Sequence, residues 1–311
     1  MRRVAGYTSF VLGAVLIFLA PLLVWYVKPR IEKAPTDVYD QIVSLGSGRY
    51  FSPQTVSVTN TRPIKVIQIY KGNPPASTKT VIVVDAFTKI SDPTVPLDIS
   101  YAEETYAFDR TTGYAVHCCG ESPPAQGVTL KFPFGSEITT YPLWDATAKK
   151  AFPAPYVRTE TLDGLKTYVY DSMVTDTVIG TIDLPGFLAG QPNQEAVTTD
   201  THYTSDTTVW IEPITGAVIK GGQHAVQWAT LPSGAFVTTL ADINVAYSPV
   251  TVSYRSSKYK KLSAQVKLVT QQLPIISPII GLILLVIGFL LARPSRRPVQ
   301  APQPRQAAPV G

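Results

Sequence analysis

The chain has 311 residues, of which 45% are hydrophobic and only 16% are charged, whereas about 25% charged residues is usual in soluble domains. Its 27 lysines and arginines outnumber its 22 acidic residues, but six of these bases lie in the two tails, which contain no acid. Residues 28–272 therefore hold 21 bases and all 22 acids. This distribution excludes the broad basic footprint of a nucleic-acid-binding domain, and we expect no nucleic-acid partner.

The first long apolar stretch runs from Tyr7 to Val27 without a charged residue. Its length matches the roughly 20 residues that a helix needs to cross a bilayer, and Pro21 is tolerated in membrane helices. No small-residue cleavage site follows it, so we predict an uncleaved transmembrane helix at 7–27 rather than a signal peptide. The arginines before it predict that residues 1–6 lie in the cytoplasm.

The segment 36–45 has the pattern of a short helix next to the membrane. Thr36 or Asp37 could cap its start, Ile42 and Leu45 lie on one helical face, and Gly46 could end it. We therefore predict a membrane-proximal helix at 36–45.

Most of residues 28–272 has the pattern of short strands separated by Pro and Gly. The continuous apolar run 79–87 suits a strand buried on both faces, and 128–134 alternates apolar with polar side chains. This pattern predicts a mainly β protein, with a large antiparallel β-sheet or barrel-like extracytoplasmic domain between N- and C-terminal transmembrane helices. Further predicted strands are 64–70, 165–174, 207–213, 225–231 and 235–247.

Two stretches about a hundred residues apart share the order acid, two residues, Thr-Gly. They begin at Asp109 and Glu212, and Gly113 and Gly216 supply the backbone freedom that a tight turn needs. We interpret them as two hairpin turns. The alternative is that Asp109 and Glu212 form a paired catalytic acid and base, but nothing else in the sequence indicates a reaction.

The only two cysteines of the chain are the neighbours Cys118 and Cys119, directly after His117. An extracytoplasmic domain favours oxidation, so a structural disulfide between Cys118 and Cys119 is our first interpretation. Free buried thiols, an intermolecular bond, and a redox or metal role that includes His117 are the alternatives. Successive side chains on a strand point to opposite faces, which argues against a metal site, and we expect no metal and no cofactor.

A second membrane-proximal helix is predicted at 257–272, with Tyr259, Leu262, Val266 and Val269 on one stripe. Basic residues near both spans could hold an anionic lipid headgroup, or could be ordinary flanking charges whose tips reach the interface. The candidate headgroup residues are Lys28, Arg30, Lys258, Lys260, Lys261 and Lys267.

The second uncharged stretch, 273–292, predicts another transmembrane helix. The tail 293–311 is rich in Pro, Gln and Ala and carries arginines, which predicts a disordered cytoplasmic segment. The chain is thus predicted to cross the plasma membrane twice, with both termini in the cytoplasm and residues 28–272 outside.

Familiar enzyme motifs do not occur in the sequence: it has no G-x-S-x-G, H-E-x-x-H, Walker loop or G-x-G-x-x-G. We expect no enzymatic activity. A hydrolase or transferase with a dispersed carboxylate site stays open as an alternative, because paired carboxylates leave no local motif.

The stretches "TYAFDRTTGYAVHCC" and "LKFPFGSEITTYPLWDATAKKAFPAPYVRTETLDGLKTYVYD" resemble the actinobacterial membrane proteins of the porin PorA family, a domain of unknown function. The similarity extends over essentially the whole chain, including both spans. With two terminal membrane helices and a large outer β domain, the chain is also similar in its arrangement to class B scavenger receptors and lysosomal integral membrane proteins. Those proteins have an apolar lipid tunnel through an antiparallel barrel.

This second resemblance implies that the outer β domain binds or transfers lipid or lipoglycan. We therefore expect a non-enzymatic cell-envelope membrane protein with an apolar interior route and with membrane lipids or lipoglycans as partners. The alternative is a scaffold or assembly factor for envelope biosynthesis enzymes.

Overall fold

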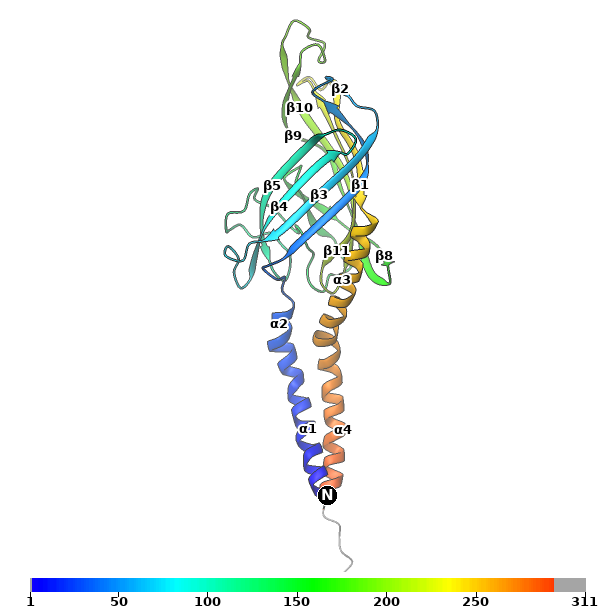
Figure 1. Ribbon diagram of the computed structural model, residues 1–311. Coiled ribbons are helices and arrows are strands. Elements are labelled where there is room, and N and C mark those ends of the chain that lie inside the picture. The colour runs from blue at the N-terminus through cyan, green and yellow to red at the C-terminus, as the bar shows by residue number, and fades with distance from the viewer. Residues whose placement is uncertain (1, 294–311) are drawn as a thin grey trace, which may run out of the picture. The chain divides into compact units, whose positions relative to one another are not determined.

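The computed structural model describes residues 2–293 and divides the chain into two compact units (Figure 1). Of the described residues, 2–28 and 269–293 belong to the helical unit, and Pro29–Leu268 form the β unit. The predicted disordered tail lies outside the described residues except for Arg293.

In the helical unit, α1 (Arg2–Leu22) continues into a π-helical turn (η1, Leu23–Val27) and the short α2 (Lys28–Ile31). At the other end of the chain, α4 (Leu273–Ala292) follows a second π-helical turn (η2, Leu268–Gln272). The helices Val4–Ile31 and Pro249–Ala292 are both long and apolar enough to cross a membrane. The two predicted spans are therefore helical, as expected.

Glycines seven residues apart let α1 and α4 pack closely. A Cβ on Gly13 would lie 2.6 Å from the Gly281 carbonyl oxygen, and one on Gly288 would lie 2.8 Å from that of Gly6. Real Cβ atoms do not approach so closely, so the backbones meet where a side chain would hold them apart. Small residues at helix contacts are typical of membrane helix pairs.

The β unit is built on one large antiparallel sheet with the strand order β5-β4-β3-β1-β12-β11-β10-β9-β8, and β2 pairs with β1 outside this path (Figure 1). A separate hairpin is formed by β6 and β7. The fold is thus mainly β and antiparallel, as predicted from the sequence. The strands are β1 Tyr39–Ser52, β2 Ser57–Val58, β3 Arg62–Gly72, β4 Val81–Asp92, β5 Leu97–Asp109, β6 Tyr141–Asp145, β7 Lys150–Ala154, β8 Tyr156–Leu162, β9 Leu165–Pro185, β10 Ala196–Glu212, β11 Ala217–Thr230 and β12 Phe236–Tyr247.

The two edge strands of the sheet, β5 and β8, are joined in sequence by residues 110–155, which we call the bridging segment. Near one edge, Ala125 of this segment packs with Ile82 and Phe108. Toward the other edge, Phe132 packs with Tyr170 and Ile211. The segment therefore contributes side chains to two hydrophobic clusters, one near each edge of the sheet.

Two segments differ from their predicted structure. Residues 36–45, predicted as a helix, contain the start of β1, which pairs with β3 and β12. Ile42 and Ser44 are buried with the alternation of a strand, and long-range pairing overrides the weak helical pattern. Residues 128–134, predicted as a strand, belong to the bridging segment and form only two isolated bridges, from Val128 to Tyr114 and to Leu143.

The predicted helix 257–272 lies within α3 (Pro249–Lys267) and η2. Ser248 caps α3 by accepting a hydrogen bond from the Thr251 amide at 3.2 Å, and the Thr251 hydroxyl donates to the Val43 carbonyl at 3.1 Å. The predicted apolar stripe is only partly correct, because Val266 is buried but Leu262 is 40% exposed. The buried face of α3 is mostly polar, and Arg255 holds it to the sheet through Asp40.

Candidate functional site

The repeated acid-x-x-Thr-Gly unit forms the same turn twice. Asp109 accepts hydrogen bonds from the amides of Thr111 and Thr112 at 2.9 and 2.7 Å. Glu212 accepts from the equivalent amides of Ile214 and Thr215 at 3.0 and 2.8 Å. Each turn ends on a glycine in the left-handed region, with φ +73° at Gly113 and +72° at Gly216. Both carboxylates therefore serve as turn caps, which is the hairpin interpretation.

These two turns hold one stretch of the bridging segment between them. The Phe134 amide donates to the Thr111 carbonyl of the first turn at 3.0 Å, and the Phe132 amide donates to the Gly216 carbonyl of the second at 2.8 Å. A Cβ on Gly216 would collide with the Phe132 carbonyl oxygen, so glycine is needed for this contact as well as for the turn.

Lys131 lies in the stretch held by the turns and is a half-buried cation. Its ammonium group donates to the carbonyls of Thr111 and Phe132 at 3.1 and 2.6 Å, and it lies 4.4 Å from the ring centre of Phe134. Burial disfavours the charged form and lowers the Lys131 pKa to about 7, although Asp109 opposes this shift.

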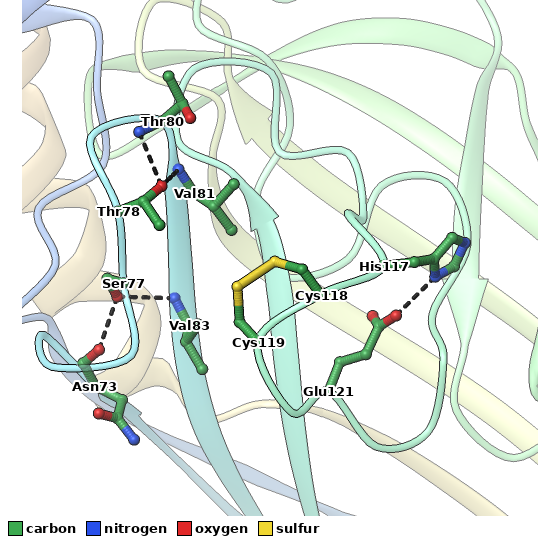
Figure 2. Close-up of a disulfide and its surroundings, with 10 residues drawn as sticks. All are labelled: Asn73, Ser77, Thr78, Thr80, Val81, Val83, His117, Cys118, Cys119 and Glu121. Carbon is green, nitrogen blue, oxygen red and sulfur yellow. Dashed lines mark hydrogen bonds and ion pairs between the residues drawn. A yellow bond between two sulfur atoms is a disulfide. The ribbon is translucent and has the colours of Figure 1, made fainter.

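Cys118 and Cys119 are joined by a disulfide in a loop that covers part of the β5 edge (Figure 2). The loop begins with the Val116 amide bonded to the Ala107 carbonyl and ends with the Ser122 amide bonded to the Thr105 carbonyl, both at 2.9 Å. Main-chain groups of β5 that would otherwise face solvent are thus paired with the loop.

Inside this loop, His117 Nδ1 lies 2.7 Å from Glu121 Oε1 (Figure 2). The other carboxylate oxygen of Glu121 is buried without a hydrogen-bond partner. Among the described residues, no group of three or more His, Cys, Asp or Glu side chains could hold a metal ion.

The candidate headgroup residues are distributed over α2 and α3. Lys28 belongs to the helical unit, whereas Arg30 and the four lysines of α3 belong to the β unit. Residues three or seven apart share a helix face, so the lysines of α3 form two pairs on different sides. The two pairs are Lys258 with Lys261 and Lys260 with Lys267. Lys260 also donates to the Asp163 carbonyl at 3.4 Å.

Buried side chains pack into several clusters inside the β unit. Tyr50 and Ile243 belong to one buried cluster, and Phe132 and Tyr170 belong to another. Polar side chains also occupy the inner face, where the Tyr203 hydroxyl donates to Asp145 at 2.9 Å. The predicted apolar interior route therefore gains no support from the described part of the β unit.

The hairpin of β9 and β10, which no sequence motif marks, projects beyond its neighbours (Figure 1). β8 pairs with β9 only as far as Tyr170, and β11 pairs with β10 only from Asp200 onward. We call residues 178–199 the arm. Val178 and Phe187 of the arm are 55% and 60% exposed, and Phe236 at the start of β12 is 64% exposed. These side chains are exposed because the neighbouring strands β8 and β11 end before the arm does. The sequence alone does not predict where those strands end.

Comparison with known proteins agrees with this architecture. The family model described as Porin PorA matches residues 5–290, which include nearly all of both terminal helices and the whole β unit. A relative described as "Porin PorA" from Corynebacterium amycolatum is 23% identical over 298 residues, with 72% of this chain and 77% of that protein covered. Two candidate membrane-spanning helices fit a membrane location. The chain belongs to the Porin PorA family.

Proposed function

We propose that this protein is a two-span docking protein of the cell envelope. In this proposal residues 28–272 lie outside the plasma membrane, both tails lie inside, and the arm binds the outer part of an envelope biosynthesis enzyme. The main support is the exposure of Val178 and Phe187 on the arm and of Phe236 on β12. Exposed apolar side chains that gather at one end of a folded unit commonly mark a contact surface.

The arm is a two-stranded hairpin that a binding partner could stabilise. A two-stranded hairpin is only marginally stable by itself in water, so a partner that covers its apolar side chains would stabilise it. At about 25 cal/mol per Å² of apolar area, covering a few such side chains contributes several kcal/mol before the costs of association.

Site-specific photocrosslinking in cells tests the docking role. A photoreactive residue at position 187 should yield one dominant covalent complex with a membrane or envelope enzyme. Val178→Ser should reduce that complex, whereas Tyr101→Ser should not, because Tyr101 is 74% exposed but lies on β5. Equal yields in the two variants, or a ladder of unrelated products, would contradict docking through the arm.

Lipid or lipoglycan binding is a second candidate, favoured by the four lysines of α3. Ammonium groups beside a membrane surface attract anionic headgroups by about 1 kcal/mol each. Here the headgroup would bind on the outside of α3, and no apolar interior route is required.

Native mass spectrometry of the full chain in nanodiscs that contain phosphatidylglycerol tests this candidate. Lys260→Glu with Lys267→Glu should reduce retained lipid, and the exposed Lys71→Glu on β3 serves as the matched control. If all three proteins retain the same lipid, these lysines are ordinary flanking charges.

A further inference from the structure

Three polar side chains on β9, β10 and β11 form a continuous hydrogen-bonded chain. His202 Nδ1 lies 2.6 Å from Asp176 Oδ1, and His202 Nε2 lies 3.2 Å from Thr230 Oγ1. A carboxylate oxygen only accepts hydrogen bonds, so Nδ1 carries the ring proton. In the neutral ring Nε2 is then the acceptor, and the Thr230 hydroxyl donates to it.

The position of the imidazole ring is fixed by its surroundings. Trp228 stacks on His202 with 5.3 Å between ring centres and 19° between ring planes. His202 lies between Thr201 and Tyr203, whose side chains are buried, so its own side chain points to the outer face of the sheet. Asp176 is 58% exposed and His202 is 20% exposed, whereas Thr230 is only 6% exposed.

Four irregularities of the sheet converge on this cluster. The pairing of β10 with β9 shifts register between Thr201 and His202 and again between Tyr203 and Ser205. The pairing of β11 with β12 shifts directly before Trp228 and directly before Thr230. Such bulges redirect side chains and are over-represented beside active sites. They provide an observation independent of the hydrogen-bond distances.

We infer that Asp176, His202 and Thr230 form an acyl-transfer site that accepts esters with an apolar acyl chain. Thr230 Oγ1 attacks the ester carbonyl carbon while its proton moves to His202 Nε2, and the alcohol leaves with that proton. The product is an acyl ester on Thr230. Water then attacks this ester and loses a proton to the same nitrogen, the bond from the acyl carbon to Thr230 Oγ1 breaks, and Nε2 returns the proton to Oγ1, which releases the carboxylic acid and restores the Thr230 hydroxyl. Nucleophile, base and orienting carboxylate have the roles of a Ser-His-Asp triad.

The flanking side chains indicate an apolar acyl chain. Phe236 is paired with Thr230 across β11 and β12 and is 64% exposed. Val178 is paired with His202 across β9 and β10 and is 55% exposed. Paired residues on adjacent strands share one face of the sheet, so both apolar side chains border the hydroxyl and the ring.

The chain contains a matched control for this arrangement. His224, on the neighbouring strand β11, also pairs with a carboxylate, at 2.9 Å from Asp242. Among residues 2–293, no hydroxyl group is hydrogen-bonded to His224 in the way that Thr230 is to His202. A change at His224 therefore removes a histidine–carboxylate pair without removing the proposed base.

The test uses the full chain in detergent and p-nitrophenyl octanoate as the probe. Wild-type protein should give a burst of p-nitrophenolate and an octanoyl adduct on the tryptic peptide of residues 221–255, which contains Thr230. His202→Gln and Thr230→Val should lower the burst rate by about 100-fold or more, the usual range for loss of a positioned base. Asp176→Asn should lower it by at least about 10-fold, whereas Thr230→Ser should retain the adduct.

His224→Gln should match wild type, and Phe236→Ser should selectively slow p-nitrophenyl octanoate relative to p-nitrophenyl acetate. Because Asp176 is exposed, Asp176→Asn should still fold. It therefore keeps the test decisive even if Thr230→Val fails to fold. The inference is overturned if no adduct forms, if the adduct persists in Thr230→Val, or if His202→Gln and His224→Gln react equally.

Discussion

Asp109 and Glu212 occupy equivalent turns, yet their surroundings shift their pKa values in opposite directions. At Asp109 burial raises the pKa, but hydrogen bonds from Thr112 and Thr111 outweigh it and the pKa falls below its usual value. At Glu212 burial is stronger than the hydrogen bonds from Thr215 and Ile214, so its pKa rises. The difference follows from depth: the second turn lies deeper in the protein than the first.

Lys131→Met tests the buried ammonium group beside these turns. The folded-state pKa of about 7 lies below the ordinary lysine value of about 10.4, so the folded protein binds fewer protons between these values. The cost of burying the charge is present in full below pH 7 and declines as pH rises. As pH rises from 7, the unfolding free energy of the wild type should therefore increase relative to that of Lys131→Met, by up to about 1.4 kcal/mol per pH unit.

Denaturant unfolding of both proteins between pH 7 and 9.5 provides the measurement. This window ends below the raised pKa values of the buried tyrosines Tyr106 and Tyr203, whose burial favours the neutral phenol. A stability difference that does not change with pH would mean that the ammonium group is not penalised by burial.

Cys118→Ser with Cys119→Ser tests the disulfide. A bond between neighbours closes almost no loop, so the loss should be smaller than the about 2–4 kcal/mol typical of disulfides. The local effect should be larger: the Thr105 amide bonds to Ser122, and its hydrogen exchange should accelerate when the loop is released. The wild-type protein, alkylated without reductant, should show no modified cysteine by intact mass. Quantitative alkylation would mean that the thiols are free.

At the scale of elements, composition and spacing predict the spans and most long strands, because these depend on runs of apolar or alternating residues. The start of β1 differs from its predicted helix because Gly46 resembles a helix stop, whereas both Gly46 and Gly48 lie within the strand. In the structure a Cβ on Gly48 would lie 2.6 Å from the Asp242 carbonyl oxygen of β12, so these glycines permit close strand approach. The sequence does not predict the cluster of Asp176, His202 and Thr230. These residues lie on three different strands, and the irregular pairing that brings them together cannot be read from the order of residues along the chain.

Gly13→Val tests the packing of α1 against α4. The added side chain would meet the Gly281 backbone, which cannot rotate away, and overpacking of this kind costs about 1–3 kcal/mol. Thermal aggregation of the full chain in detergent should begin at a lower temperature. The control is Ala14→Val, since Ala14 lines an outward apolar hollow of α1 with Phe10 and Phe18. Equal onset temperatures would show that the glycine contact contributes little.

At the scale of the whole molecule, the charge distribution predicts how the chain crosses the membrane. All 22 acids lie in residues 28–272, whereas both tails are purely basic. Alkaline phosphatase inserted at Gly190, where added atoms meet open space, should be active. The same enzyme fused after residue 311 should be inactive, and a fluorescent protein there should be bright. An active phosphatase at the C-terminus would exclude the two-span arrangement.

The contacts of the bridging segment also constrain how the β unit can come apart. Its residues 132–134 are bonded to turns that lie about a hundred residues apart in the chain. Loop-closure entropy makes such contacts slow to form, since both halves of the sheet must be present first. Once formed, they link the opening of β4 and β5 to that of β10 and β11. Amides on these two strand pairs should then exchange through one shared unfolding event, so that the β unit is a single cooperative unit rather than two independent halves.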